Sequence, residues 1–209
     1  MATTQRGTGF RVGIGLLALE LVNLVASLGI LSGYRFPGTD FVVLIVVDAV
    51  PAAVFLLMFV LVVLRVRGGR NVAINRLAIV YLALATVQTI ANVFYLVSSG
   101  RPYGTSLLWG VGVLGGAYLQ IVAVFTGWYW LLDHSVPGGA FGFPEADVNP
   151  AFRPNLVDYV FISFNTNSTF GPTTELVKSR HVKLLMMLQT SLSLAILLVF
   201  VARLIGLEQ

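Results

Sequence analysis

The segment at residues 161–181, FISFNTNSTFGPTTELVKSRH, carries small hydroxyl and amide side chains of the kind that line ion pathways. It begins aromatic and apolar, becomes small and polar around Gly171 and Pro172, and ends basic. Polar, irregular backbone is tolerated at membrane depth only inside protein or beside a water-filled cavity. There it would present carbonyl and hydroxyl oxygens to a passing ion. The plainer alternative is a surface loop between two membrane helices.

Two carboxylates, Glu20 and Asp48, interrupt long apolar stretches elsewhere in the chain. A charge at the centre of a membrane helix costs about 2.5–3.5 kcal/mol on insertion scales, so both are candidates for a proton or cation relay. The alternative is a hydrogen-bonded seam that holds helices together. Further polar residues of the same stretches would join that seam: Asn23, Gln88, Asn92 and Gln120.

Enzymatic chemistry is not indicated. The chain has no cysteine, which excludes disulfides and thiolate metal sites. Its two histidines, His134 and His181, lie far apart and have no companion carboxylate pattern, so neither a metal centre nor a catalytic triad is suggested. We therefore expect no catalytic residues and no cofactor.

The composition places the chain in the membrane class. Of its 209 residues, 57% are hydrophobic and 11% charged, and the mean hydropathy is +0.88, too apolar for a soluble domain of this size. The net charge of +4 comes mainly from arginines in short loops. In membrane proteins that pattern reflects topology and anionic headgroups rather than nucleic acid. A multi-pass protein of the cell membrane is expected, with the lipid bilayer as its surroundings.

Five apolar segments are long enough to cross a bilayer, which takes about 20 helical residues. They are residues 11–33, 41–64, 76–98, 106–132 and 183–206. Residues 155–165, NLVDYVFISFN, allow about three helical turns, or ~16 Å, which is too short to cross. The sequence therefore predicts an all-α integral membrane protein with five transmembrane helices plus a re-entrant pore helix and loop.

The segment LDHSVPGGAFGFPEADVNPAFRPN follows the fourth of these segments and contains four prolines. Proline density of this kind predicts that no helix persists there. We expect Phe141, Phe143 and Phe152 to pack this loop against the mouth of the bundle.

Residues 159–174 read YVFISFNTNSTFGPTT, and residues 184–206 read LLMMLQTSLSLAILLVFVARLIG. Together the stretch from Tyr159 to Gly206 resembles the pore module of tetrameric potassium channels. The resemblance implies two parts, a three-helix membrane bundle at 1–104 and a pore-like module at 105–209. It also implies a homotetramer, because such pores close around a fourfold axis, and it implies permeant monovalent ions. The pore-like module would contain an outer helix 106–132, a pore helix 155–165, a filter-like loop 166–174 and an inner helix 183–206.

The filter-like loop departs from the family's pattern. The positions that read T-V-G-Y-G in the family fall on Thr169, Phe170, Gly171, Pro172 and Thr173. The second glycine, which allows conformations costly for other residues, is a threonine here, and proline fixes its own φ. The resemblance therefore implies low or altered potassium selectivity. The family's gating-hinge glycine falls on Ser193, which makes Ser193 a hinge candidate.

Glu175 follows the filter-like loop, and four copies around an axis would form an acidic ring at the pore mouth that favours cations. The basic residues after it, Lys178, Arg180, His181 and Lys183, would offset that ring. We expect a homotetrameric pore-loop channel for small ions, with cations favoured. Two alternatives stay open: a non-conducting scaffold or accessory subunit with the same fold, and a proton-coupled carrier based on Glu20 and Asp48.

The arginines after the second apolar segment cluster at a helix end and loop, which is typical of a cytoplasmic anchor rather than a voltage sensor: Arg65, Arg67, Arg70 and Arg76. With five crossings, ten of the 13 Lys and Arg residues fall on the side from which the pore loop enters. The resemblance places that side outside the cell, whereas the positive-inside rule places it inside. The charge distribution favours an inverted pore loop that opens to the cytoplasm. A third alternative is that one of the first three apolar segments does not fully cross the membrane.

Overall fold

The computed structural model describes residues 4–33, 38–64, 72–98, 107–149, 151–168 and 175–205. Within these residues the fold is helical, as predicted. The helices are α1 (Thr4–Gly33), α2 (Gly38–Leu64), α3 (Val72–Ser98), α4 (Leu107–Ser135), α5 (Pro144–Val148), α6 (Leu156–Asn167) and α7 (Arg180–Ile205). Two short strands, β1 (Phe141–Gly142) and β2 (Leu176–Val177), pair antiparallel with Phe141 opposite Val177.

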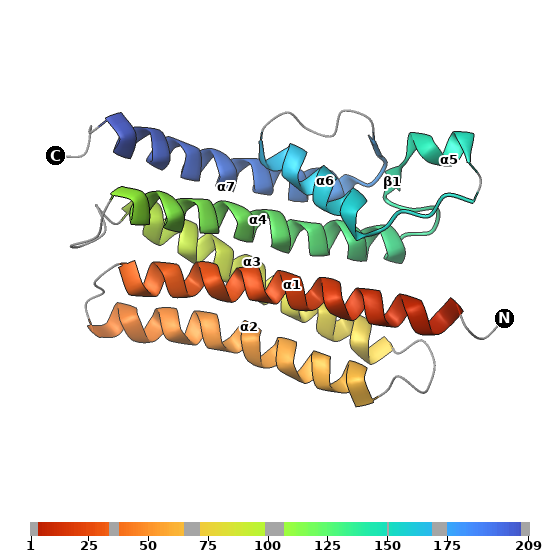
Figure 1. The fold of residues 1–209 in the computed structure, drawn as a ribbon, viewed down its shortest axis with the longest axis horizontal. Coiled ribbons are helices and arrows are strands. Elements are labelled where there is room, and N and C mark those ends of the chain that lie inside the picture. The colour runs from red at the N-terminus through yellow and green to blue at the C-terminus, as the bar shows by residue number, and fades with distance from the viewer. Residues whose placement is uncertain are drawn as a thin grey trace.

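The long helices run side by side along the length of the molecule, and the two chain ends lie at opposite ends of the bundle (Figure 1). Helix α4 is central, because it packs against α1 and α3 as well as against α6 and α7. Helix α2 packs on α3 and α1 at the other side of the bundle. The predicted three-helix part and the predicted pore-like part therefore meet along α4.

Three helical stretches among the described residues are long and apolar enough to cross a membrane: Arg76–Ser98, Trp109–Ser135 and Arg180–Arg203. Shorter apolar stretches occur in α1 and α2, at Leu17–Ser32 and Ile45–Val60. Many large apolar side chains lie on the outside of these helices, including Leu21, Leu56 and Leu198. An apolar exterior over this length is compatible with a membrane protein.

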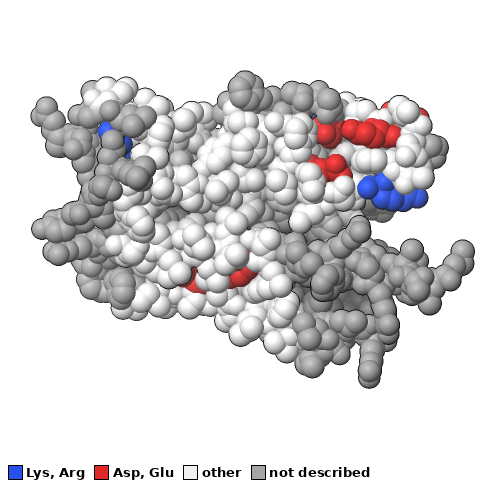
Figure 2. Space-filling model, in the orientation of Figure 1, with Lys and Arg blue, Asp and Glu red and all other residues white. Residues whose placement is uncertain are grey.

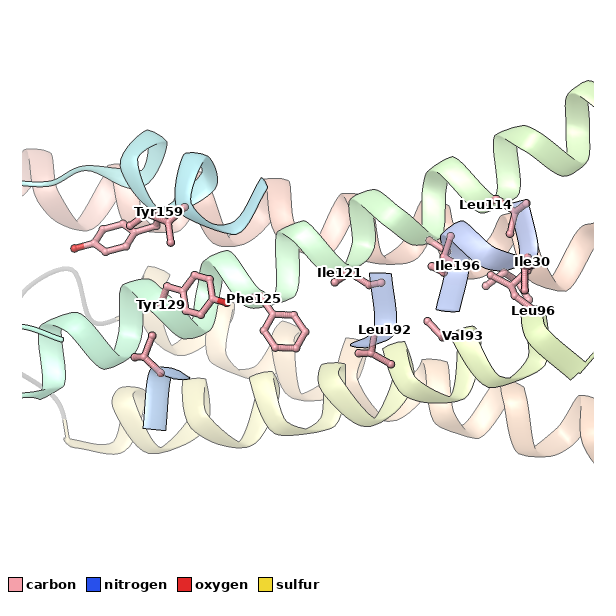
Figure 3. Close-up of a cluster of buried hydrophobic side chains, with 14 of the residues drawn as sticks. Ile30, Val93, Leu96, Leu114, Ile121, Phe125, Tyr129, Tyr159, Leu192 and Ile196 are labelled. Atoms are coloured by element: carbon pink, nitrogen blue, oxygen red, sulfur yellow. The ribbon is translucent and has the colours of Figure 1, made fainter. Parts of the chain in front are cut away.

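Two clusters of apolar side chains hold the helices together. One fills the space between α3, α4, α6 and α7, where Ile121 and Phe125 of α4 lie beside Leu192 of α7 (Figure 3). The other joins α1, α2, α3 and α4, with Met58 and Tyr81 fully buried. Trp130 of α4 packs against both clusters, so α4 joins the two halves of the core.

The observed bounds of α6 differ from the predicted ones at both ends of the helix. The predicted pore helix 155–165 is observed as Leu156–Asn167. Asn155 caps the helix instead of opening it, and Thr166 and Asn167 belong to the helix although they were assigned to the filter-like loop. Both side chains are buried, so tertiary packing extends the helix past its apolar part.

The segment after α4 contains more regular structure than its prolines predicted. Helix α5 forms there, so the expectation that no helix persists is wrong for these five residues. Pro144 stands in the first turn, where its missing N–H would have no partner in any case. The predicted packing of this segment is confirmed, because Phe141 and Phe143 are buried and Phe152 packs against the same core.

Candidate functional sites

The start of α6 is fixed by a capping box. The Asn155 side chain accepts a hydrogen bond from Val157 N at 2.8 Å, and the Asp158 carboxylate accepts one from Asn155 N at 2.6 Å. A reciprocal cap of this type satisfies two backbone donors that a helix start leaves without intrahelical partners. The sequence N-x-x-D thus fixes where the half-length helix begins.

Asp133, near the end of α4, ties this start to the rest of the bundle. Its Oδ1 accepts hydrogen bonds from Ala140 N at 2.6 Å and Phe141 N at 2.9 Å, while its Oδ2 accepts one from the Tyr159 hydroxyl at 2.7 Å. Burial, together with the neighbouring Asp133 carboxylate, raises the pKa of Tyr159 above its ordinary value. Tyr159 therefore stays protonated and donates. One carboxylate joins α4, the following loop and α6.

From this start, α6 runs along α4 toward the middle of the molecule (Figure 1). The Ser163 hydroxyl donates to Val122 O at 2.8 Å, and Asn167 Nδ2 donates to Tyr118 O at 3.3 Å. Between the levels of Asp133 and Tyr118, α4 rises by ~22 Å. Helix α6 therefore ends about half-way along α4, far from the bundle end at which it begins.

The chain nevertheless returns to the end where α6 began. The described residues resume at Glu175, and β2, directly after it, pairs with β1 beside the last turn of α4. Helix α7 then runs the full length of the bundle from that end (Figure 1). The segment that contains α6 thus enters and leaves the bundle at one end.

Gln189 of α7 clamps the inner half of α6. Its Nε2 donates to Ser163 O at 2.8 Å, to Ser163 Oγ at 3.0 Å and to Asn167 Oδ1 at 3.4 Å. Its Oε1 accepts a hydrogen bond from the Tyr129 hydroxyl of α4 at 2.5 Å. Ser193 donates to Asn167 Oδ1 and to Gln189 O. All five side chains are buried, so the contact between α4, α6 and α7 is polar at its centre.

The end of α6 carries partial negative charge. Its final carbonyl groups lack full intrahelical partners, and the aligned peptide dipoles place about half a negative charge there. The backbone N–H of Ser168 satisfies Phe164 O and Thr166 O in part. The outward face of the helix is apolar, with Val160, Phe161 and Phe164 exposed. The Ser168 and Thr190 hydroxyls also donate to Asn165 O and Thr166 O, so the helix end at mid-length of the bundle keeps only part of this negative charge.

Some of the predicted site residues belong to the described part of the chain, and others lie outside it. The filter-like positions Thr169, Phe170, Gly171, Pro172 and Thr173 all lie outside the described residues. Glu175, predicted at the pore mouth, is buried directly before β2, and its Oε2 has no hydrogen-bond partner among the described residues. Ser193, the hinge candidate, is buried and joins α7 to α6.

Sequence reasoning missed Asp133, Tyr129 and Gln189 as organisers of this region. Gln189 had a readable signal, because it is a lone amide within a long apolar helix and such residues bond across helices. Asp133 directly follows its apolar segment, a position at which a charged residue is common and indicates no special role. Its role depends on a loop fold that no local pattern reveals.

A second polar group lies inside α1–α4. Four amide side chains donate in one direction, from Asn92 to Gln120 at 3.1 Å, Gln120 to Asn23 at 2.5 Å, Asn23 to Gln88 at 2.7 Å and Gln88 to Asp48 Oδ1 at 2.7 Å. The Ser27 hydroxyl accepts from Gln88 and Asn92 and also bonds Asp48. These hydrogen bonds form the seam between helices that the sequence offered as an alternative to a relay. We call the four linked amide side chains, Asn92, Gln120, Asn23 and Gln88, the amide chain.

Asp48 and Glu20 occupy different places beside the amide chain. Asp48 is half-buried on α2 and accepts the last hydrogen bond of the amide chain. Glu20 of α1 is 4% exposed and accepts a hydrogen bond from the Tyr81 hydroxyl at 2.5 Å on Oε2, while Oε1 has no partner among the described residues. Figure 2 shows acidic atoms midway along the bundle, apart from the other charged atoms of this face, which lie toward its two ends.

The amide chain and the end of α6 lie at the same level of α4. Gln120 points into the amide chain, whereas the carbonyl groups of Tyr118 and Val122 accept from α6. The two polar sites are thus separated by the width of a single helix. Within the described residues, no group of three His, Asp or Glu side chains is arranged to hold a metal ion.

Protein-family models, curated proteins and solved structures were compared with this chain, and none matches it. The resemblance of residues 159–206 to the potassium-channel pore module therefore stays a prediction.

Proposed function

We propose that this chain is one subunit of a homotetrameric pore-loop ion channel of low or altered potassium selectivity, with cations favoured. Five helices, α1–α4 and α7, would cross the membrane, and α6 would enter it half-way as a re-entrant pore helix. The observation that carries the proposal is the course of α6, which ends about half-way along α4 in a segment that enters and leaves at one end of the bundle.

A half-crossing segment suits ion passage for a physical reason. Irregular backbone at membrane depth is tolerated where it is covered by protein or borders water, and ion selectivity is built from such backbone and from short polar side chains. Residues 169–174, TFGPTT, follow the end of α6 and have that composition. The negative end of the helix dipole beside them supports a preference for cations.

Assembly is supported by the faces that one chain leaves uncovered. Helix α7 is the least buried of the three spanning stretches, with large apolar side chains exposed along it, among them Met187, Leu194 and Leu198. The outward face of α6 is apolar as well. Four copies would cover part of these faces and enclose an axis, which one copy cannot do.

The proposed orientation is inverted, with α6 entering from the cytoplasm. The start of α1, the β1–β2 pair and the start of α7 lie at one end of the bundle (Figure 1). With five crossings, ten of the 13 Lys and Arg residues belong to that end. The positive-inside rule then puts this end in the cytoplasm.

The non-conducting scaffold is the second candidate, and a specific observation favours it. The polar side chains of α7 that face the bundle are engaged within one chain, since Gln189 and Ser193 bond α6 rather than an open cavity. The exposed face of α7 is largely apolar beyond its first turn, where Ser191 is the exposed polar side chain among the described residues, and an apolar wall opposes wetting of a pore. A scaffold would keep this packing and pass no current.

The test is recording of the purified protein in a planar bilayer under a KCl gradient, then under a gradient of NaCl. The channel proposal expects stepwise currents, a reversal potential on the cation side and weak discrimination between K⁺ and Na⁺. Thr173→Gly, which restores a filter-position glycine, should change the permeation ratio. The matched control is Thr174→Gly, one residue beyond the filter-like positions, which should leave the ratio unchanged.

Oligomeric state separates the outcomes of that test. Stepwise currents from a tetramer support the channel, whereas a tetramer that stays silent under both gradients supports the scaffold. A monomer in mild detergent that is silent in the bilayer overturns the channel proposal. Equal permeation ratios for wild type and Thr173→Gly would show that the filter positions are misassigned.

A further inference from the structure

Glu20 and Asp48 lie in the same bundle interior but differ in burial and in how completely their oxygens are hydrogen-bonded. Asp48 receives Gln88 Nε2 and the Ser27 hydroxyl, and Gln88 is itself the last member of the amide chain. Hydrogen bonds that all run in one direction polarise one another, so the amide chain concentrates donor strength on Asp48. These hydrogen bonds lower the cost of a negative charge on Asp48, which its burial raises.

Glu20 is more deeply buried. It is 4% exposed, the Tyr81 hydroxyl donates to its Oε2, and the Asn23 side chain also bonds the carboxylate. Oε1 faces no donor among the described residues. A buried anionic oxygen with neither donor nor water is costly, whereas a neutral carboxylic acid in the same place costs far less. The unpartnered oxygen indicates that Glu20 is neutral, with a bound proton.

Lys and Arg are absent from residues 17–33, 42–64, 77–98 and 109–135, the parts of α1–α4 that surround these carboxylates. These stretches therefore supply no basic side chain that could balance a charge on Glu20. The titratable group that bonds Glu20 is Tyr81 of α3. Asp48 of α2 is the other carboxylate of this interior, and no hydrogen bond joins it to Glu20 among the described residues.

We propose that Glu20 is a proton-binding site in the centre of α1–α4 and carries a bound proton. Tyr81 is a positioning residue, because its hydroxyl fixes one oxygen of Glu20 and leaves the other for the proton. Asp48, half-buried at the end of the amide chain, is the carboxylate nearer to the surface of the bundle. Glu20 bonds Tyr81 of α3 rather than α6, so its protonation does not depend on whether α6 lines a pore.

The first experiment is infrared spectroscopy of the purified full-length chain in lipid nanodiscs at neutral pH. A protonated carboxyl in an apolar site gives a carboxylic-acid C=O stretching band separate from that of carboxylates. The band is expected in wild type and in Asp48→Asn, and it should be lost in Glu20→Gln. These two substitutions are matched, because each replaces a carboxyl by its own amide. A band that persists in Glu20→Gln, or is absent from wild type, overturns the proposal.

A second measurement needs no variant and so covers the case in which Glu20→Gln does not fold. Dicyclohexylcarbodiimide adds to protonated carboxyls in apolar surroundings, and peptide mapping locates the adduct. Label is expected on the peptide that contains Glu20 and should decline as the pH rises. Label on Asp48 instead of Glu20, or label independent of pH, overturns the assignment. Neither readout involves ion current, so failure here and failure of the channel proposal are distinguishable.

Discussion

The clamp formed by Gln189 gives the sharpest test of how α6 is held. Gln189 accepts from the Tyr129 hydroxyl at 2.5 Å and donates to Ser163 O and Oγ at 2.8 and 3.0 Å. Gln189→Leu keeps the approximate size of the side chain but makes it apolar and removes every one of these bonds. The Tyr129 hydroxyl is then left buried without its acceptor.

The expected magnitude follows from the groups left unpaired. A buried polar group without a partner costs about 1–3 kcal/mol. Interhelical hydrogen bonds in membrane bundles average about 0.6 kcal/mol and reach about 1.7 kcal/mol. The loss of the Tyr129 and Ser163 partners should therefore lower the free energy of unfolding by about 2–3 kcal/mol. Tyr129→Phe alone leaves Gln189 Oε1 unpaired and should cost about 1 kcal/mol.

The double variant Tyr129→Phe/Gln189→Leu decides whether the two side chains act together. With both partners apolar, no hydroxyl is left unpaired, so the combined cost should be smaller than the sum of the single costs by about 1 kcal/mol. The assay is reversible unfolding in mixed micelles, driven by added SDS and followed by circular dichroism. Ser191→Ala is the control, because Ser191 is exposed on the same helix and bonds only its own turn at Met187 O. Additivity of the two single costs within about 0.3–0.5 kcal/mol would refute the clamp.

Three further outcomes are expected in the same unfolding assay. Gly127→Leu should lower the free energy of unfolding by about 1–3 kcal/mol through overpacking, because a Cβ there would lie 2.7 Å from Leu82 Cδ2. Gly115→Leu is the control and should change the stability little, because a Cβ at Gly115 meets nothing within 4 Å. Asn155→Ala should cost about 0.5–2 kcal/mol through loss of the α6 cap. Above about pH 10 the unfolded chain loses the Tyr159 proton while the folded chain keeps it, so the free energy of unfolding falls as pH rises. Tyr159→Phe should lessen this fall by up to about 1.4 kcal/mol per pH unit.

Each of these outcomes has a result that contradicts it. Equal stability of Gly127→Leu and Gly115→Leu would show that α4 does not approach its neighbours closely at Gly127. An unchanged free energy of unfolding in Asn155→Ala would remove the capping box as the start of α6. An alkaline slope equal to that of wild type in Tyr159→Phe would mean that the hydroxyl does not stay protonated against Asp133.

Sequence alone predicted the helical class and the approximate position of every long helix. Helix length and apolarity are local properties, so residues 76–98 and 183–206 could be recognised without knowledge of their neighbours. The same holds for residues 155–165, whose apolar part was too short to cross a membrane. The seam of amides was also predictable, because a buried amide must find a partner inside the bundle.

Tertiary structure determines which buried polar side chains bond each other and where the helices end. Whether Gln120 meets Asn23 or turns toward α6 depends on how α4 is rotated and how far it slides along its neighbours. Thr166 and Asn167 were predicted in a loop, yet their contacts with α4 and α7 keep them helical. Such features depend on residues that are distant in the chain, and apolar packing sets their register. The sequence therefore determined which segments are helices, and only the packing of α4 against its neighbours determined which polar groups meet.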